Sequence, residues 1–190
     1  MRLIGIAGTN GAGKDTVGNL LAEQYNLLFV SVSDLLREEA RARNLPVTRE
    51  VLREISAEWR REFGLGVLVD RAIKQFRGHG GKYSGVVACP MRNEGEAQHL
   101  KDLGGTLVWV DANPHVRYER VMQADRGRPG EDDKTFEEFF AEEEAEMKRL
   151  GDKATLSTGD VKKIADVFIE NDDNDLKKLR AILDKKIKID

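Results

Sequence analysis

Five short apolar runs predict the β-strands of this chain. They are Leu3 to Ala7, Leu27 to Val32, Val86 to Ala88, Thr106 to Val110 and Val167 to Ile169. A short apolar run that ends at a glycine, as the first one does at Gly8, is typical of a strand buried on both faces of a parallel sheet.

Apolar positions at helical spacing predict helices between these strands. The first helix follows Lys14, and its apolar positions are Val17, Leu20, Leu21 and Tyr25. The second extends from a cap at Ser33 through Arg43. The third is capped by Thr48 and stopped by Gly64, and its apolar face consists of Val51, Leu52, Ile55, Trp59 and Phe63.

Further helices are predicted at Val67 to Phe76, from the cap Asn113-Pro114 past Arg120, within the acidic stretch Glu131 to Glu146, and from about Asp175. The acidic helix has aromatic residues that give it a packing face. Strands that alternate with helices imply a parallel sheet with right-handed crossovers, so the fold class is α/β.

Composition narrows the class of protein. The chain has 190 residues, which fits one domain, with 40% hydrophobic and 34% charged residues. Its formal net charge of −3 argues against a general nucleic-acid binder, which would carry a basic stripe. Cys89 is the only cysteine, which excludes an internal disulfide and favours a reducing cytoplasm. We expect no targeting signal and no membrane span.

The stretch "GTNGAGKDT" after the first strand predicts a phosphate-binding loop. Backbone N–H groups of a glycine loop and the N-terminus of the following helix bind phosphate oxygens, while a lysine supplies a mobile positive charge. We expect ATP to be bound by Asn10, Gly11, Ala12, Gly13, Lys14, Asp15 and Thr16. The alternative is a strand-to-helix turn that binds no nucleotide.

Asp15 occupies the position where this kind of loop usually has Ser or Thr. A bare carboxylate repels a triphosphate, but a divalent cation between the two groups reverses the sign of the interaction. Because Mg²⁺ prefers oxygen ligands, we expect Asp15 to help hold it, with the Thr16 hydroxyl nearby. Alternatively, Asp15 only stabilises the N-terminus of the helix.

Several stretches carry a resemblance to known kinases. "GKDT" resembles the phosphate loop of phage-type deoxynucleoside monophosphate kinases, and "PMRNEGEAQHLKDLGG" resembles the segment after their third strand. "SDLLREEARARNL", "LREISAEWRREFG", "PHVRYERV" and "IADVFIENDDNDLKKL" resemble archaeal dephospho-CoA-kinase-like proteins. The resemblance implies a three-layer α/β/α P-loop kinase with a five-stranded parallel sheet. It also implies one domain over 1–190, acceptor-binding helices at about 33–77 and a small lid at about 125–149.

The same resemblance assigns the acceptor site to Asp34, Arg37 and Arg92. Arginine suits a phosphorylated acceptor because it binds two phosphate oxygens at once. The segment with Asp34 and Arg37 follows the second predicted strand, and Arg92 follows the third. The carboxyl ends of these strands share one edge of the sheet, where ligands bind in open α/β folds. The alternative for each residue is a surface salt bridge with Glu38, Glu94 or Glu96.

Arg126 and Arg128 resemble the lid arginines of these kinases. A closed lid excludes water from the site, and its arginines neutralise negative charge on the transferred phosphoryl group. Their alternative is a solvated basic turn beside an acidic helix. Asn171, in "IENDD", resembles the segment near the adenine base of these kinases. Many of these kinases have an acidic residue at the end of the third strand that helps to hold magnesium, whereas this chain has Ala88-Cys89-Pro90. We therefore expect Asp15 to contribute more to magnesium binding.

Three functions remain open from the sequence. The first is transfer of the γ-phosphoryl group of Mg-ATP to a nucleoside or deoxynucleoside monophosphate, in which Lys14, Arg126 and Arg128 are catalytic. The second is a dephospho-CoA kinase, in which Asp34 would act as base toward a ribose hydroxyl. The third is a nucleotide-dependent switch. We expect a monomer or homodimer whose partner is a small-molecule acceptor, with neither nucleic acid nor membrane.

Overall fold

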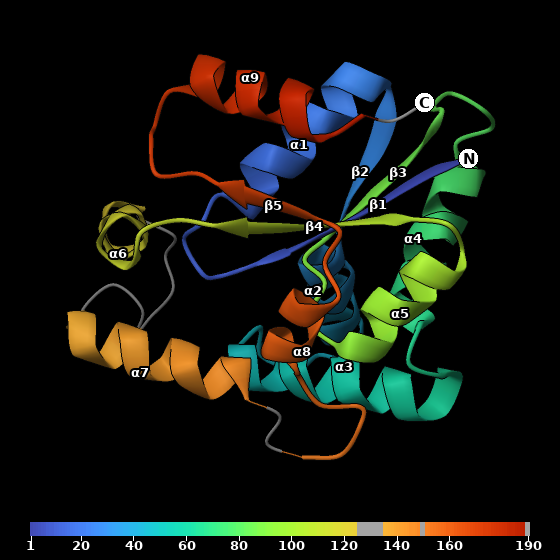
Figure 1. The fold of residues 1–190 in the computed structure, drawn as a ribbon. Coiled ribbons are helices and arrows are strands. Elements are labelled where there is room, and N and C mark those ends of the chain that lie inside the picture. The colour runs from blue at the N-terminus through green and yellow to red at the C-terminus, as the bar shows by residue number, and fades with distance from the viewer. Residues whose placement is uncertain (125–134, 149–150, 189–190) are drawn as a thin grey trace.

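The computed structural model describes residues 1–124, 135–148 and 151–188. In this part of the chain, five parallel strands form one sheet in the order β2-β3-β1-β4-β5 (Figure 1). The strands are β1 (Arg2–Gly8), β2 (Leu27–Ser31), β3 (Gly85–Cys89), β4 (Thr106–Asp111) and β5 (Val167–Glu170). The predicted α/β class and parallel five-stranded sheet are therefore confirmed.

Helices cover both faces of this sheet (Figure 1). Helices α1 (Lys14–Tyr25) and α9 (Leu176–Lys186) share one hydrophobic core with the sheet. The second core lies on the other face and is formed with α2 (Val32–Ala42), α3 (Arg49–Phe63), α4 (Val67–Gly78), α5 (Glu94–Asp102) and α8 (Thr158–Lys163). Helices α6 (Pro114–Gln123) and α7 (Phe136–Met147) lie beyond the carboxyl ends of the strands.

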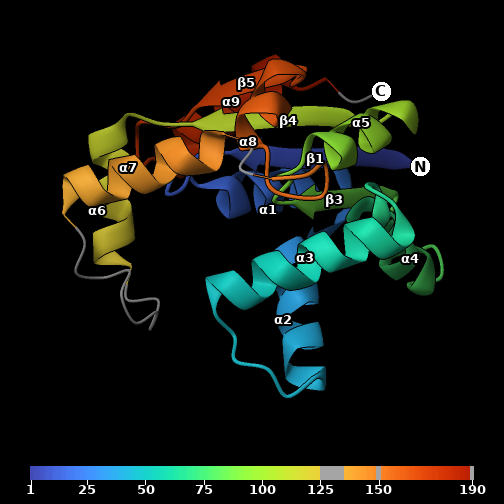
Figure 2. The same ribbon diagram turned by 90° about the horizontal axis from the view of Figure 1, so that it is seen from below.

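Strand β1 lies between β3 and β4, so the strand order reverses around it. In open α/β sheets, ligands bind at the carboxyl ends of the strands next to such a reversal. The loop after β1 and the segment after β3 meet at this place. Helices α2 and α3 project from the same side of the sheet (Figure 2).

Most predicted helix ends agree with the structure. The Thr48 hydroxyl accepts a hydrogen bond from the Val51 N–H, and Gly64 ends α3. The acidic helix is α7, whose N-terminus has a capping box between Thr135 and Glu138. Its packing face is small, since only Phe139 in it is buried.

The structure differs from the expected elements in three places. Helix α2 begins at Val32 and is capped by Ser31, whose hydroxyl accepts from the Asp34 N–H at 3.1 Å, so Ser33 is not the cap. Phe63 belongs to the predicted apolar face of α3, but it is the last residue of the helix and is 55% exposed, so the buried part of that face ends before it. Helix α8 was missed because six residues are too few to show a helical period.

Candidate active site

A cleft of about 1150 Å³ lies at the carboxyl edge of the sheet. Its walls come from the loop after β1, from α2 and α3, and from the segment after β3. It joins Lys14 to the predicted acceptor residues Asp34, Arg37 and Arg92. Residues that are up to 78 positions apart in the sequence thus share one cavity, as the predicted phosphate and acceptor sites require.

The loop after β1 has the backbone of an anion-binding turn. Gly11 and Gly13 have φ angles of 77° and 86°, which residues with a side chain rarely adopt. Helix α1 begins directly after Gly13, so its N-terminal N–H groups face the cleft with the positive end of the helix dipole. The Lys14 ammonium donates to the Thr9 carbonyl oxygen at 2.6 Å.

Gly11 also makes a close approach to α6. A Cβ atom at this position would lie 2.5 Å from the Arg117 carbonyl oxygen, a backbone atom that cannot move aside. We expect Gly11→Ala to lower the free energy of unfolding by about 2–4 kcal/mol, combining left-handed strain and overpacking. Urea unfolding measures this loss, and isothermal titration with ATP measures the accompanying loss of binding.

Gly104→Ala is the matched control for this prediction. Gly104 has a φ of 78°, nearly the same as Gly11, but a Cβ atom there meets nothing within 4 Å. It therefore reports the backbone strain alone, at about 1–2 kcal/mol. Equal losses in the two variants would contradict the close approach of α6 to the loop.

The electrostatic state of Lys14 is set by its surroundings. Burial, followed by the positive charge of Arg92, lowers the pKa of Lys14 from 10.5 to about 8, although the negative charges of Asp15 and Glu146 act in the opposite direction. A cation this poorly solvated gains from an anion placed beside it. The charge of Lys14 therefore favours the binding of an anion, such as a phosphate group, at the loop.

Asp15 and Thr16 are exposed at the first turn of α1 and line the cleft. Asp15 Oδ1 accepts a hydrogen bond from the Cys89 thiol at 3.4 Å, and among the described residues its other oxygen has no such contact. A carboxylate oxygen and a hydroxyl beside a phosphate site are suitable ligands for Mg²⁺, which retains several waters. The described residues contain no group of three or more metal-ligating side chains that could hold a metal without the nucleotide.

Cys89 does not have the properties of a nucleophile. It is fully buried, and burial together with the Asp15 charge raises the pKa of its thiol well above 9.0. The thiol is therefore protonated at neutral pH. Cys89 is thus an inert core residue.

Buried polar contacts brace the loop from behind. The Thr9 hydroxyl donates to Asp111 at 2.7 Å, and the Arg117 guanidinium donates to the Asn10 carbonyl oxygen at 3.3 Å. Asn171, which the sequence placed near the adenine, donates from its side-chain amide to the Ala12 carbonyl oxygen at 2.8 Å. Sequence reasoning missed Asp111 and Arg117, because only the folded chain brings them to the loop.

A second, smaller hollow of about 270 Å³ adjoins the loop on the side of α9. Arg120 and Asn171 line it together with Gly11, Gly13 and Thr16 of the loop region. Arg120 donates to the Asn171 carbonyl oxygen at 2.8 Å, which fixes both residues at the edge of the hollow. The structure therefore places Asn171 beside the phosphate loop and at a pocket large enough for a flat ring.

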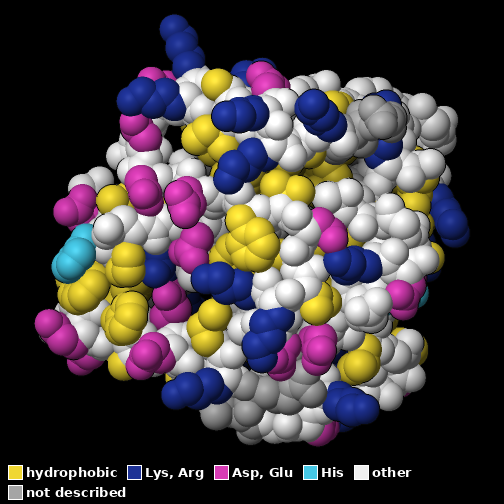
Figure 3. Space-filling view, viewed as in Figure 1, with side chains coloured by type: hydrophobic (Ala, Val, Ile, Leu, Met, Phe, Trp, Pro, Cys, Tyr) yellow, Lys and Arg dark blue, Asp and Glu magenta, His cyan; other side chains and the backbone are white. Residues whose placement is uncertain are grey.

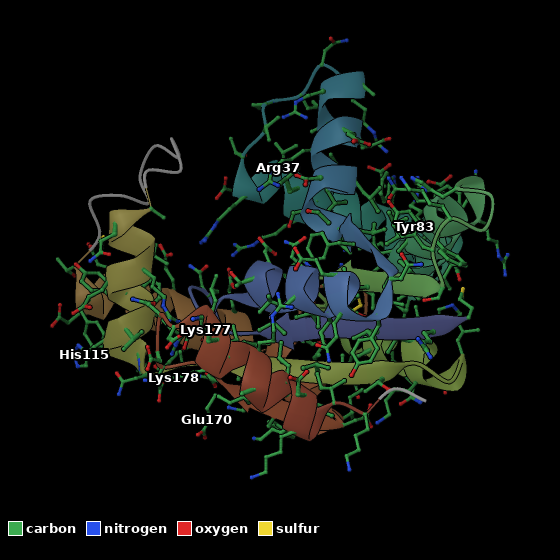
Figure 4. All side chains as sticks on the ribbon, turned by 90° about the horizontal axis from the view of Figure 1, so that it is seen from above. Arg37, Tyr83, His115, Glu170, Lys177 and Lys178 are labelled. Carbon is green, nitrogen blue, oxygen red and sulfur yellow. The ribbon has the colours of Figure 1, made fainter. Side chains whose placement is uncertain are left out.

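Of the predicted acceptor residues, Arg37 and Asp34 form an ion pair of 2.6 Å within α2. Arg37 of this pair lies well apart from Lys177 and Lys178 of α9 (Figure 4). Partial burial works to raise the pKa of Asp34, but hydrogen bonds from Arg37 and Ser31 and the Arg37 charge outweigh it, and the pKa lies below 3.8. The predicted alternative partner Glu38 does not take part in this pair.

Helix α3 adds arginines that the sequence analysis did not single out. Arg49, Arg53 and Arg60 all line the cleft, together with Ser56. Their spacing of four, three and four residues follows one face of a helix, and this regularity in the sequence was the available signal. The side of the cleft formed by Arg37, Arg92 and these α3 arginines, called the acceptor wall below after the predicted role of Arg37 and Arg92, thus has more guanidinium groups than the sequence analysis identified.

The backbone of Arg92 is held by the buried carboxylate of Glu96. Its backbone N–H donates to Glu96 Oε2 at 3.3 Å, and the same carboxylate accepts from Arg60 Nε at 2.7 Å. Its guanidinium pairs with Glu146 of α7 at 3.1 Å, not with Glu94 or Glu96 as the alternative held. Arg126 and Arg128, the predicted lid arginines, lie outside the described residues.

Comparison with protein families gives one matching family model, described as an AAA domain, over residues 7–139. A UPF0200 protein of Pyrococcus abyssi is 30% identical over 176 residues, covering 90% of this chain and 88% of the relative. A UPF0200 protein of Methanocaldococcus jannaschii is 31% identical over 173 residues, covering 90% and 82%.

Solved structures with the same fold include two shikimate kinases. The one from Bacteroides thetaiotaomicron has a TM-score of 0.58 at 15% identity, covering 97% of this chain and 95% of its own. The one from Aquifex aeolicus has a TM-score of 0.57 at 20% identity, covering 96% and 94%. These similarities confirm the expected P-loop kinase fold. Among the described residues, no helix has both the length and the apolar character that crossing a membrane requires.

Proposed function

The chain belongs to the AAA domain family and to the UPF0200 family, and we propose that it transfers the γ-phosphoryl group of ATP to a nucleoside or deoxynucleoside monophosphate. The observation that carries this proposal is the single cleft that joins Lys14 to Arg37 and Arg92. A donor phosphate at the loop and an acceptor phosphate at the arginines would share that cavity.

The chemistry needs little from the protein beyond positioning and charge. The attacking oxygen of an acceptor phosphate is already anionic, so no general base is required. Lys14 neutralises charge on the donor phosphates, and Arg37 and Arg92 hold the acceptor phosphate. Without these cations the two phosphate groups would repel each other. Arg126 and Arg128 remain the proposed lid arginines, which would add positive charge to the transferred group.

Magnesium would be held by Asp15 and Thr16 together with the phosphates. Bound there, the ion would neutralise part of the charge on the donor phosphates. The Cys89 thiol bonds to one Asp15 oxygen, which leaves the other for the metal or for one of its waters.

The adenine ring is proposed to lie in the smaller hollow beside α9. Arg120 can stack its guanidinium on the ring or hydrogen-bond to its edge. Asn171 holds the loop through Ala12 and at the same time lines the hollow, so its role is to join the base site to the phosphate site.

The alternative dephospho-CoA kinase reaction is less well supported than the monophosphate kinase reaction, because Asp34 is poorly suited to act as its base. That reaction benefits from a base that accepts the proton of a ribose hydroxyl, and a low pKa makes a carboxylate a weaker base. Asp34 is paired with Arg37 and has a lowered pKa. Both properties fit an anion that orients the Arg37 side chain. We therefore assign Asp34 to the positioning of Arg37.

The experiment that tests the function measures ADP release from Mg-ATP with a panel of acceptors. The panel contains each ribo- and deoxyribonucleoside monophosphate, dephospho-CoA, shikimate and no acceptor. Strong stimulation by one group of monophosphates is the expected result. Stimulation by dephospho-CoA or shikimate alone would replace the proposed acceptor, and tight ATP binding without any stimulation would favour a nucleotide-dependent switch.

The lowered pKa of Lys14 makes ATP binding pH-dependent. The free protein loses the Lys14 proton above about pH 8, whereas bound phosphate favours the charged form. ATP affinity should therefore fall as the pH rises above 8, by up to about tenfold per unit, and binding at pH 9 should take up close to one proton. Isothermal titration in two buffers of different ionisation enthalpy measures this uptake.

Lys14→Arg is the control, because arginine stays charged throughout this range. Its residual ATP binding should show no proton uptake at pH 9. Wild-type binding without uptake at that pH would contradict the assignment of Lys14 to the phosphates.

A further inference from the structure

Helix α7 places a carboxylate on the arginines of the acceptor wall. Glu146 pairs with Arg92 at 3.1 Å through one oxygen and with Arg53 through the other. The two arginines come from different elements, α3 and the segment after β3, and both line the cleft. Helix α7 leads from beside α6 toward α8 (Figure 1), and the long side chains of Glu146 and Arg53 span the distance between α7 and α3.

This contact differs from an ordinary surface salt bridge. The Glu146 side chain is only 18% exposed, and its two oxygens bridge two guanidinium groups. Burial works to raise its pKa, but the charges of Arg92, Arg53 and Arg49 outweigh it and hold the pKa below 4.5. Glu146 is therefore an anion in a site built for an oxyanion.

The position also belongs to the same cleft as the phosphate loop, because Arg92 and Lys14 both line that cleft. The charge of Glu146 acts on Lys14, as does that of Arg92. One turn earlier in α7, Glu143 pairs with the buried Arg117, which donates to the loop carbonyl of Asn10. Helix α7 is thus tied to the loop through Glu143 and to the acceptor wall through Glu146. In the space-filling view, acidic side chains lie beside Lys and Arg side chains around this region (Figure 3).

We propose that Arg53 and Arg92 form an oxyanion subsite for the acceptor, that Glu146 occupies it in the unliganded protein, and that the acceptor phosphate displaces Glu146. This deepens the proposed function, because it names the ligand class as a phosphate monoester. A monoester dianion has two charges and three terminal oxygens for the two guanidinium groups, whereas a carboxylate has one charge and two oxygens. Uncharged acceptors would leave Glu146 in place.

Inorganic phosphate is the probe that tests the subsite without any turnover. Glu146→Gln removes the competing charge and should bind phosphate about tenfold more tightly than wild type by isothermal titration. Glu144→Gln is the matched control, since Glu144 is an exposed acid of the same helix and should leave the affinity unchanged. Phosphate can also bind at Lys14, so Arg53→Gln is added to Glu146→Gln. The double variant should lose the whole gain.

Two results would overturn the proposal. One is equal phosphate affinity in wild type and Glu146→Gln, and the other is a gain that survives in the double variant. Hydrogen exchange on wild type is a second measurement that needs no variant. Phosphate should accelerate amide exchange at the C-terminal end of α7, and unchanged exchange would also contradict displacement. Neither measurement uses ATP, so failure of the kinase reaction and failure of this subsite are distinguishable.

Discussion

Replacement of Lys14 by alanine is expected to lower acceptor-dependent ADP formation by about 10²- to 10³-fold. Loss of one preorganised charge on a transferred group has an effect of this size in other enzymes. In this protein burial and the charge of Arg92 lower the pKa of the ammonium, which gains most when an anion binds beside it. Steady-state kinetics with the acceptor that the panel identifies would measure the change in kcat and in the KM for ATP.

Lys74→Ala provides the control, because Lys74 is an exposed lysine of α4 outside the cleft. Neither variant should unfold. Lys14 donates one hydrogen bond to the Thr9 carbonyl, and removal of a desolvated cation offsets its loss. Activity of Lys14→Ala within tenfold of wild type would contradict the site, provided that thermal unfolding shows both variants folded.

The phosphate loop could be predicted from the sequence because its parts are consecutive. Gly11, Gly13 and Lys14 act through local backbone geometry, and a preceding strand with a following helix is enough to place them. The parallel sheet could be predicted for a related reason, since each buried strand is a continuous apolar run. In both cases the physical cause lies within a few residues.

The acceptor wall could be predicted only in part. Arg37 and Arg92 came from a resemblance, whereas Arg53 depends on how α3 packs against the sheet. No local pattern pairs Glu146 with Arg53, 93 positions away, or joins Thr9 to Asp111 across 102 positions. These contacts follow from the strand order and from the direction of α7, which are properties of the whole fold.

The start of α2 shows how an error in prediction can arise from chemistry that was correctly identified. Serine was the right residue type for the cap, but Ser31 and Ser33 are both available. Ser31 pairs with Cys89 as the last residue of β2 and also caps α2, so strand and helix adjoin without a linker. Tertiary pairing with β3 therefore decides between two equally good caps.

The buried pair of Arg60 and Glu96 leads to the largest expected effect on stability. Their side chains are 2% and 1% exposed, and they meet at 2.7 Å. Arg60 also donates to the Ala154 carbonyl oxygen at 2.8 Å. Glu96→Gln keeps the shape of the side chain but leaves the guanidinium charge without a counter-ion. Breaking a buried pair in this way costs about 3–5 kcal/mol.

The free energy of unfolding in urea should fall by that amount, and the melting temperature by about 6–20 °C. Asp102→Asn removes an acid from the same helix at an exposed position and should change the free energy by less than about 1 kcal/mol. The double variant Arg60→Met with Glu96→Leu removes both charges and should regain most of the loss. A loss below about 1 kcal/mol in Glu96→Gln would show that the pair is not buried in solution.

The same variant links stability to the acceptor site. Glu96 accepts the Arg92 N–H at 3.3 Å, so the backbone that carries Arg92 is held by the buried pair. Below its melting temperature, Glu96→Gln should raise the KM for the acceptor more than the KM for ATP, because the phosphate loop has its own supports in Asp111, Arg117 and Asn171. Equal increases would mean that the pair supports the whole edge of the sheet. A selective increase would mean that it sets the position of the acceptor arginine.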